Sequence, residues 1–451
     1  MTHVGKQATL VQKAGLGPIP AIADEVERTR LIDAHEHLDE EAVRLRQPNN
    51  LTRFFMYYSL ADLVSAGLPD KAQGRFFAGD ITGEEQWRLI RDYWPLARNT
   101  GFCKAITIST RELYGIDDLS DGTIKPLLAA VAKRNRPGVL NWMLREKCGI
   151  ETCLVGAEDP GDFSRRTAHP GLFVFDIAGT AFEGGKGDFS RFEKPSGIRV
   201  RTLSDWKKLV EWALGRWGKQ AVGIKFLHGY WRVLRHEDVP EKVAAPLFEK
   251  CVARKKDLAP KERTALDDFI VHYLVKRAAD LDLPVRFHTG YLGGNNYADL
   301  SYSRVRDLAN LFRAYPKVRF DVYHLGYPEW PDVVTLAKHF TNVYANMCWA
   351  WIIDPAASLE FARSAIRALP ANKVLGFGGD FGYADVVYGH SRIARDGIAR
   401  VMSEAVREGW LTRGDAKAMI RRWLHDNAVE LFRLEERKCV QARGVPSALT
   451  A

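Results

Sequence analysis

The sequence predicts an α/β protein built as a distorted (β/α)8 barrel (TIM barrel), because strand-like and helix-like segments alternate along most of the chain. Short apolar runs rich in Val, Ile, Leu and Phe are typical of the buried strands of a parallel sheet. Stretches with apolar residues every three or four positions separate most of the later runs, which is the pattern of a barrel. The eight predicted strands are residues 31–37, 152–156, 172–177, 221–227, 284–288, 318–324, 342–346 and 374–377.

The predicted barrel spans residues 30–435 and carries a helical insertion after its first strand, at 41–150. Segments of this insertion have apolar residues at helical spacing, and the stretch is too long for an ordinary barrel connection. Residues 1–29 are expected to form a loosely attached lead-in in which Gly and Pro break any helix, and 436–451 a C-terminal tail. Two amphipathic helices within 397–433 are expected to pack outside the barrel or across its bottom.

Composition and charge narrow the class of protein. Hydrophobic residues make up 46% and charged residues 27% of the chain, which is ordinary for a globular protein. No apolar run approaches the roughly 20 residues of a membrane span, and the N-terminus lacks a signal-peptide core, so we expect a cytoplasmic protein with no membrane partner. The net charge is +9, but the basic residues are scattered and mixed with acidic ones, which argues against nucleic acid as a partner. The excess of positive charge favours a small anionic substrate. A homo-oligomer is left open.

The stretch RLIDAHEHLDE, residues 30–40, contains the first candidate for a metal site. Residues i and i+2 of a strand point to the same side, so His35 and His37 can converge on one point. Two convergent imidazoles at a strand end suit a divalent, zinc-like ion. A His-x-His pair also arises by chance, so the prediction depends on the other strand ends.

Several later strands also end in residues that can do chemistry. Strand four carries Lys225 with His228 just after it, strand five ends in His288, strand six in His324, and strand eight is followed by Asp380. The active site of a barrel lies at the carboxyl ends of its strands, so these side chains are expected to meet there. Each histidine alone could simply bind a backbone carbonyl, but the ensemble predicts a metal centre.

In these motifs the sequence resembles the amidohydrolase superfamily, from about Leu31 to the end of strand eight. The nearest resemblance is to the uronate-isomerase-like and FluG-like members of the amidohydrolase-2 branch. They share a long helical insertion after strand one, a strand-five loop similar to HTGYLGGNN at 288–296, and an Arg after the strand-eight Asp, here Arg392. The resemblance implies a metal-dependent barrel enzyme.

The resemblance also implies roles for individual residues. His35, His37, His288 and Asp380 would be metal ligands, and Asp380 would also take the proton of the attacking water. His324 would bind a second metal in two-metal members, or polarise the scissile carbonyl in one-metal members. The ligands are nitrogen and oxygen without thiolate, which suits Zn and equally Mn or Fe. One ion is favoured over two.

Lys225 decides between those metal counts. In two-metal amidohydrolases a strand-four lysine is carboxylated and bridges both ions. The alternative keeps Lys225 as an ammonium that pairs with a carboxylate of the protein or substrate, and the scarcity of further carboxylates in the motifs favours this alternative. Lys225 is therefore predicted to be an electrostatic or substrate-binding group of the catalytic site.

Aromatic and polar residues near the strand ends are expected to line a pocket for a small organic molecule. Trp231, Tyr291 and Arg392 are the candidates for substrate binding, with Arg392 as a carboxylate clamp. Trp349 and Trp351 are expected only to cover the barrel rim.

The sequence thus predicts a metal-dependent hydrolase that uses a metal-activated water to cleave an amide, ester or lactone bond in a small, carboxylate-bearing molecule. Two alternatives keep the same metal site: non-oxidative decarboxylation of an aromatic or unsaturated acid, and aldose–ketose isomerisation of a uronic acid. A non-catalytic barrel acting as a scaffold is a third, which the intact set of ligand residues disfavours.

Overall fold

The computed structural model describes residues 17–56, 58–157, 171–184, 187–254 and 258–443. It contains an eight-stranded, all-parallel sheet whose strands follow one another in chain order, which confirms the predicted barrel. Each predicted apolar run overlaps one of these strands. The strands are β1 (Leu31–Glu36), β2 (Ile150–Ala157), β3 (Phe173–Ala178), β4 (Ile224–Phe226), β5 (Val285–Phe287), β6 (Phe320–Val322), β7 (Val343–Asn346) and β8 (Val374–Leu375).

The barrel is closed by backbone hydrogen bonds between β1 and the segment that follows β8. The amide of Ala34 donates to the carbonyl of Phe377 at 3.1 Å, and the amide of Asp380 donates to the carbonyl of His35 at 2.9 Å. The amide of His37 donates to the carbonyl of Phe381 at 3.0 Å. This seam therefore joins the first predicted ligand stretch to the last.

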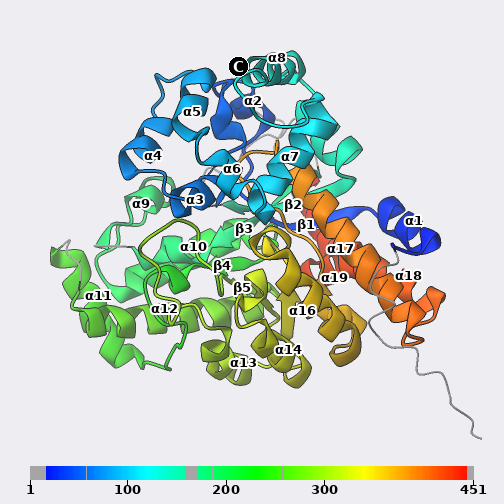
Figure 1. The fold of residues 1–451 in the computed structure, drawn as a ribbon. Coiled ribbons are helices and arrows are strands. Elements are labelled where there is room, and N and C mark those ends of the chain that lie inside the picture. The colour runs from blue at the N-terminus through cyan, green and yellow to red at the C-terminus, as the bar shows by residue number, and fades with distance from the viewer. Residues whose placement is uncertain (1–16, 57, 158–170, 185–186, 255–257, 444–451) are drawn as a thin grey trace, which may run out of the picture.

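Between β1 and β2 the described chain is mainly helical, as predicted, and its helices form the upper lobe in Figure 1. Local signals fix several helix ends: Thr82 and Glu85 form a reciprocal capping box, and Gly115 ends a helix in the left-handed conformation. The elements are α2 (Glu41–Arg44), η2 (Leu51–Arg53), α3 (Tyr58–Ser65), α4 (Asp70–Phe76), α5 (Gly83–Ile90), α6 (Trp94–Ala97), α7 (Gly101–Tyr114), α8 (Ile124–Arg134) and the π-helical η3 (Asn141–Lys147).

The remaining helices surround the barrel (Figure 1). After β3 come η5 (Gly179–Glu183), α9 (Ser190–Ser196) and α10 (Leu203–Trp217), and after β4 come η7 (His228–Tyr230), α11 (Glu241–Arg254) and α12 (Pro260–Asp280). Those after β5, β6 and β7 are η8 (Val305–Leu308), α13 (Ala309–Ala314), η9 (Tyr323–Gly326), α14 (Trp330–His339), α15 (Ala350–Ile353), α16 (Pro355–Ala368) and η10 (Ala371–Lys373). The C-terminal elements are α17 (Val387–Arg407), α18 (Arg413–Arg421), the π-helical η11 (Arg422–Asp426), α19 (Asn427–Phe432) and α20 (Leu434–Arg443).

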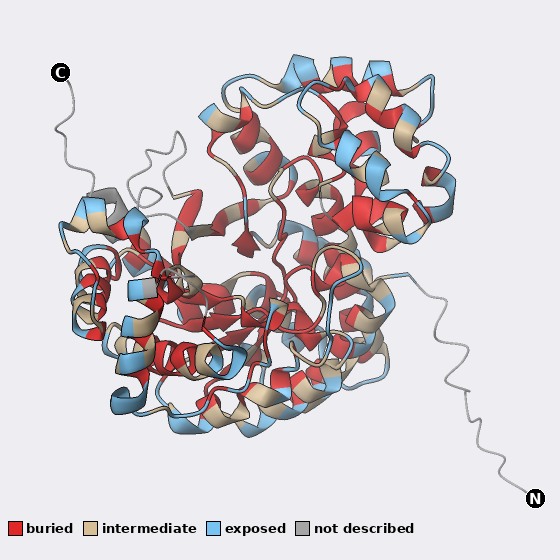
Figure 2. Cartoon of the chain, turned by 90° about the vertical axis from the view of Figure 1, so that its left-hand side faces the viewer, coloured by how far each residue is buried: buried red, intermediate tan, exposed pale blue. Residues whose placement is uncertain are grey.

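The barrel has an apolar floor and a charged middle. At its floor, Ile32 and Leu375 pack with Leu431 and Phe432 of α19, so the C-terminal helices cover the bottom as expected. Above this layer Arg286 of β5 is fully buried and forms ion pairs at 2.8 Å with Asp176 and at 3.0 Å with Asp321. Figure 2 shows the strands as a buried centre within the ring of helices. The charged layer ties β3, β5 and β6 together directly beneath the strand ends.

The expectation of a loosely attached lead-in is wrong for its described part. Residues 20–28 form helix α1 (Pro20–Arg28), because Pro20 stands at the first helical position, where its missing N–H costs nothing. Ile22 and Val26 are buried, and the carbonyl of Val26 accepts a hydrogen bond from Arg395 of α17. Residues 1–16, and 444–451 of the predicted tail, lie outside the described residues.

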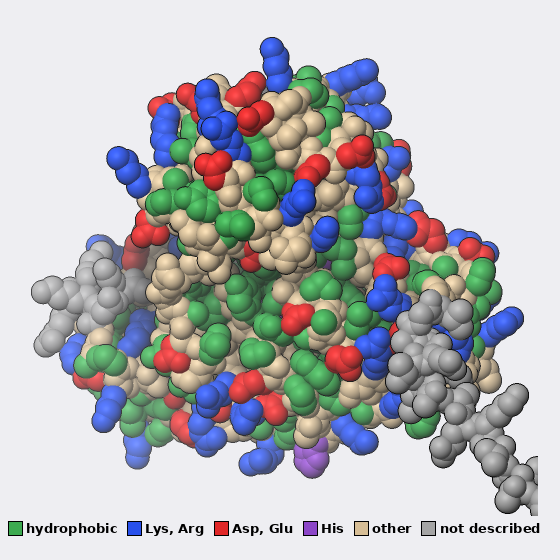
Figure 3. Space-filling model, in the orientation of Figure 1, with side chains coloured by type: hydrophobic (Ala, Val, Ile, Leu, Met, Phe, Trp, Pro, Cys, Tyr) green, Lys and Arg blue, Asp and Glu red, His purple; other side chains and the backbone are tan. Residues whose placement is uncertain are grey.

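The surface agrees with the scattered charge read from the sequence. Basic and acidic side chains alternate over the face in Figure 3, without a continuous basic stripe on that face. No helix among the described residues is long and apolar enough to cross a membrane.

Candidate metal centre at the β1–β8 seam

β1 brings its two histidines together at the mouth of the barrel. The strand is buried along its whole length, and His37 is the first residue beyond it. The Nε2 atoms of His35 and His37 lie 3.2 Å apart. The His35 side chain is fully buried, whereas 38% of the His37 side chain is exposed, so the pair opens to solvent on the His37 side.

The backbone after β8 places Asp380 against this pair. Asp380 Oδ1 lies 3.2 Å from His37 Nε2 and 3.5 Å from His35 Nε2. This oxygen is buried, and no described residue donates to it in normal hydrogen-bond geometry. A buried, unsatisfied carboxylate oxygen costs free energy, and two nitrogens beside it complete a donor set that fits a divalent cation. The residues present therefore fit a metal ion.

His288 and His324 lie apart from that trio and face each other. His288 Nε2 is 2.9 Å from the carbonyl oxygen of Tyr291, and His324 Nδ1 is 2.9 Å from that of Cys348. Carbonyls only accept, so each of these nitrogens carries its proton. The other nitrogens, His288 Nδ1 and His324 Nε2, face each other at 3.1 Å. In neutral rings each of these two nitrogens carries a lone pair, and the two lone pairs repel each other. A cation or an additional proton between them would relieve this repulsion.

The predicted four-ligand set is thus divided between two positions. His288 belongs to none of the groups of described His, Cys, Asp and Glu whose donor atoms lie within 4.8 Å of one another. Two of those groups contain Asp380: one with His35 and His37, the other with His324 and Cys348. His324 Nε2 is 3.5 Å from Asp380 Oδ2, so Asp380 lies between the two histidine pairs.

Burial lowers the pKa of the three buried imidazoles of the site, His35, His288 and His324. It lowers the pKa of His324 to about 4, and burial together with Lys225 lowers the pKa of His35. Burial and the neighbouring His324 lower the pKa of His288. Burial alone would raise the pKa of Asp380, but His35, His37 and His324 reverse this and hold it well below its usual value. Neutral imidazoles and an ionised carboxylate are the forms that bind metal.

Lys225 reaches the same place from β4. Its Nζ lies 2.5 Å from His35 Nε2, and the residue is only 5% exposed. Burial lowers the pKa of Lys225, against the opposing effect of Asp380 and Asp176. The structure therefore brings Lys225 to the candidate metal centre, where burial lowers its pKa.

The three predicted substrate-binding residues have different surroundings. Trp231 follows η7 and is 47% exposed, with its edge toward His228. The ring of Tyr291 lies 5.4 Å from that of Trp349, beside the centre. Arg392 is not brought to the site: it lies on α17 and pairs with Glu27 of α1 at 2.7 and 2.9 Å. Arg392, the predicted carboxylate clamp, is thus already paired with a carboxylate of the protein itself.

Trp349 and Trp351 are buried rather than spread over the rim. The ring of Trp349 packs edge-on against His324, with centroids 5.1 Å apart, and it also contacts Tyr58. Trp351 Nε1 donates to the carbonyl of Gly376 at 3.0 Å. The expectation that they only cover the rim is wrong, because both rings are enclosed and Trp349 forms a wall of the metal centre.

Sequence reasoning missed Asp33, Glu36 and Tyr58. Tyr58, at the start of α3 in the insertion, hydrogen-bonds the side chain of Asp380. Burial raises the pKa of Asp33 to about 7 and raises that of Glu36 well above its usual value. A signal for the two carboxylates was present, since each stands in an apolar strand that the barrel buries. Nothing in the sequence places Tyr58.

A second group of metal-capable side chains lies under the β3 and β4 loops. Donor atoms of Glu183, His228 and Asp267 lie within 4.8 Å of one another, and all three residues are buried. Here Arg263 contacts Asp267 at 2.6 Å and His228 contacts Glu183 at 2.7 Å.

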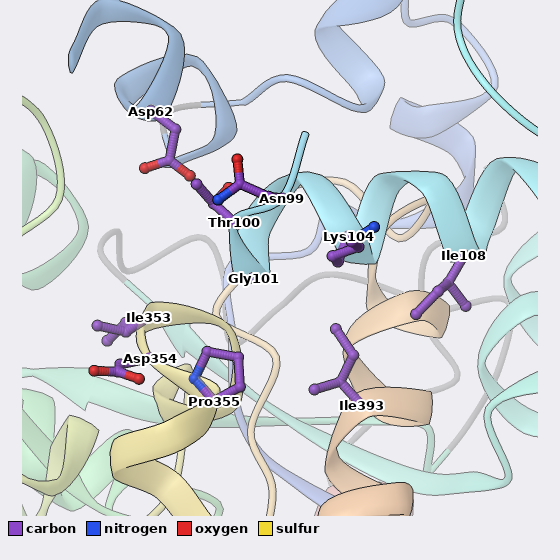
Figure 4. A pocket seen from close by; sticks show the side chains of 10 residues that line it. All are labelled: Asp62, Asn99, Thr100, Gly101, Lys104, Ile108, Ile353, Asp354, Pro355 and Ile393. Carbon is purple, nitrogen blue, oxygen red and sulfur yellow. The ribbon is translucent and has the colours of Figure 1, made fainter. Parts of the chain in front are cut away.

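A surface cavity of about 460 Å³ lies where the insertion meets the barrel (Figure 4). Asp62, Thr100 and Lys104 line its insertion side, and Asp354 and Ile393 line its barrel side. None of the predicted site residues lines it, so the cavity is separate from the metal centre.

The fold and the donor set define a barrel with a candidate metal site at its strand ends, and comparisons with known proteins agree with the fold. Residues 220–434 match the family model described as Amidohydrolase. A 196-residue segment is 24% identical to protein fluG of Emericella nidulans, covering 42% of this chain and 22% of that longer relative. The chain therefore spans less than a quarter of the length of this relative.

Solved structures give the same fold over nearly the whole chain. Uronate isomerase from Thermotoga maritima aligns with a TM-score of 0.77 at 16% identity, covering 91% of this chain and 96% of its own. Glucuronate isomerase from Caulobacter crescentus aligns with a TM-score of 0.75 at 16% identity, covering 92% and 93%. The match of residues 220–434 to the Amidohydrolase family model agrees with the resemblance to the amidohydrolase superfamily that the motifs indicated.

Proposed function

We propose that the chain is a metal-dependent hydrolase that cleaves an amide, ester or lactone bond in a small, carboxylate-bearing substrate. The observation that carries this proposal is the convergence of His35, His37 and the unsatisfied Asp380 Oδ1 at the open end of the barrel. His37 is the ligand open to solvent, so substrate reaches the centre from its side. A divalent ion held there, with Zn as the first candidate and Mn or Fe as alternatives, supplies Lewis-acid activation of water.

The protein's own groups perform the proton transfers. Asp380, kept ionised by its histidine neighbours, accepts a proton from the attacking water. His324 Nε2, 3.5 Å from Asp380 Oδ2, is placed to receive that proton and pass it to the leaving group. Tyr58 and Trp349 enclose Asp380 and His324, which limits the water around them. Trp231 and Tyr291 are proposed to contact the substrate.

The number of ions is the finer part of the proposal. One ion between His35, His37 and Asp380 remains our proposal, with Lys225 as an electrostatic or substrate-binding group. The facing nitrogens of His288 and His324 favour a specific alternative, a second ion at that position. Histidine ligands of metals commonly donate their other N–H to a carbonyl, as both of these do. Lys225 would then be the carboxylated bridge.

Isomerisation of a uronic acid is the second candidate reaction. It is supported by the alignment of two uronate or glucuronate isomerases with more than nine-tenths of this chain. At this level of identity the likeness shows the fold, so the reaction itself needs a direct assay. In that reaction Asp380 or His324 would move a proton between neighbouring substrate carbons.

One assay separates these reactions. Protein stripped with a chelator and reloaded with Zn, Mn or Fe(II) is given lactones, esters and amides of small carboxylic acids, and separately glucuronate and galacturonate. In labelled water, hydrolysis incorporates the oxygen of water into the acid product, whereas isomerisation yields a ketose acid with no net addition of water. Uronate conversion without any hydrolysis would replace our first proposal with the second. Protein that binds no metal and shows no metal-linked rise in melting temperature would support the scaffold instead.

A further inference from the structure

Three successive amides around Asp380 are all held by β1. The amide of Gly379 donates to Asp33 Oδ1 at 2.9 Å, that of Asp380 to the carbonyl of His35 at 2.9 Å, and that of Phe381 to Glu36 Oε2 at 2.6 Å. Two of these three acceptors are side-chain carboxyl groups. The segment that carries Asp380 is therefore held on both sides by Asp33 and Glu36, which lie close in sequence to the other two candidate ligands, His35 and His37.

The need for such support is visible in the backbone of Asp380. Its φ is +62°, a left-handed conformation that costs free energy for a residue with a side chain. A residue keeps such a conformation only when its surroundings impose it. The hydrogen bonds on either side of Asp380 supply that restraint, and they turn its carboxylate toward His35 and His37.

An irregularity in β1 lets two carboxyl groups reach the same place. In a regular strand Asp33 would share a face with His35 and His37, and Glu36 would point to the other face. The pairing of β1 with β2 shifts register between Asp33 and Glu36, and the two side chains hydrogen-bond each other. Asp33 also accepts from the amide of His35 at 3.3 Å. The pair thus contacts both ligand-bearing segments.

Gly379 makes room for this pair. A Cβ at position 379 would lie 1.8 Å from Glu36 Oε1 and 3.3 Å from Asp33 Oδ2. The carboxyl groups therefore sit directly on the Cα of Gly379, where any side chain would displace them.

We infer that Glu36, together with Asp33, is a positioning residue that holds Asp380 in its metal-binding conformation by binding the amides of Phe381 and Gly379. The inference rests on the proposed metal site of His35, His37 and Asp380. Groups that orient metal ligands typically contribute about 10- to 100-fold to metal affinity, and we expect that range here.

Metal affinity of the chelator-stripped full chain tests this role, measured by competition of Zn with a chromogenic chelator. Glu36→Leu removes the acceptor at similar size and should weaken Zn binding about tenfold or more. Glu36→Gln keeps an oxygen at the same reach and should stay within about threefold of wild type. Glu36→Asp keeps the carboxylate but shortens it, and should behave like Glu36→Leu. Glu36→Asp replaces Glu36→Leu in the test if the leucine variant does not fold.

A double-mutant cycle tests whether Glu36 acts through Asp380. In an Asp380→Asn background the same Glu36→Asp or Glu36→Leu change should alter Zn affinity less than about threefold. An equal loss in both backgrounds would overturn the inference, and so would wild-type affinity in both Glu36→Leu and Glu36→Asp. Wild-type protein that binds no Zn would instead refute the proposed metal site, which distinguishes the two failures.

Discussion

The two histidine–carboxylate groups of this protein use the same residue types in opposite surroundings. At the β1–β8 seam, His35, His37 and Asp380 meet, no guanidinium of the described residues contacts the carboxylate, and one imidazole is open to solvent. Under the β3 and β4 loops, Glu183, His228 and Asp267 are enclosed, and Arg263 pairs with Asp267. Among the described residues, the carboxylate of the first group has no guanidinium partner, although the buried Lys225 lies close enough to interact with it, whereas Asp267 of the second group has such a partner.

The difference shows that donor type and spacing alone do not make a metal site. A cation gains most where a buried carboxylate has no other positive partner, and least where a guanidinium already neutralises it. A neighbouring network has the same feature: the Arg232 guanidinium pairs with Asp268 at 2.6 Å, and Asp268 also contacts His236. We therefore propose that the seam binds the metal and that the second group stabilises the packing of the β3 and β4 loops.

The largest effect is expected from removing the two histidines of the seam. His35→Ala with His37→Ala should abolish both bound metal and metal-dependent turnover, because two of three donors at the first position are lost. The control is His228→Ala, which should keep the metal content of wild type. Mass-spectrometric metal analysis of dialysed protein measures both. Full occupancy in the double variant would disprove the assignment.

The next effect concerns the two aspartates. Asp380→Asn should keep part of the metal but lose about a thousandfold or more in turnover, since the proton acceptor and the activation of water both suffer. Asp267→Asn should leave turnover of the folded enzyme within a fewfold. It should lower unfolding free energy by about 3 kcal/mol, because it leaves the Arg263 guanidinium without its charge partner. Steady-state kinetics and urea unfolding separate the two outcomes. Near-normal turnover in Asp380→Asn would transfer the role of base to His324.

A smaller effect is expected from Lys225. If one ion is bound, Lys225→Ala should retain it and raise the Michaelis constant about tenfold through loss of a substrate contact, a magnitude set by about 1.4 kcal/mol of binding energy. Close to two ions in wild type, with loss in Lys225→Ala, would instead establish the second position at His288 and His324. Metal analysis together with kinetics on both proteins gives the answer.

The last prediction is a pH dependence of the unfolding free energy, caused by His236, whose ring lies 5.0 Å from that of His228 in the second group. Burial lowers the pKa of His236 from 6.5 to about 3, so the unfolded chain binds a proton there that the folded chain does not. Stability from this group is therefore lost as pH falls below 6.5, by about 2 kcal/mol between pH 7 and pH 5. His236→Gln should remove this component and flatten the decline. Urea unfolding at both pH values measures it, and parallel declines in the two proteins would contradict the assignment.

The barrel could be predicted from one sequence, because each strand lies in an apolar run and parallel strands buried on both faces have such runs. It also placed His35, His37, His288, His324, Lys225 and Asp380 at strand ends, and a barrel brings strand ends together. Periodicity and strand position are local properties, so one sequence suffices to read them.

Tertiary structure decided which partners the side chains meet. Arg392 could not be recognised as the partner of Glu27, because the two residues meet only when α1 packs on α17. The split of the histidines into two facing pairs depends on carbonyls of Tyr291 and Cys348, which carry no sequence signal. The contacts of Asp33 and Glu36 with the amides around Asp380 arise only when the barrel closes and brings residues more than 340 positions apart into hydrogen-bond distance.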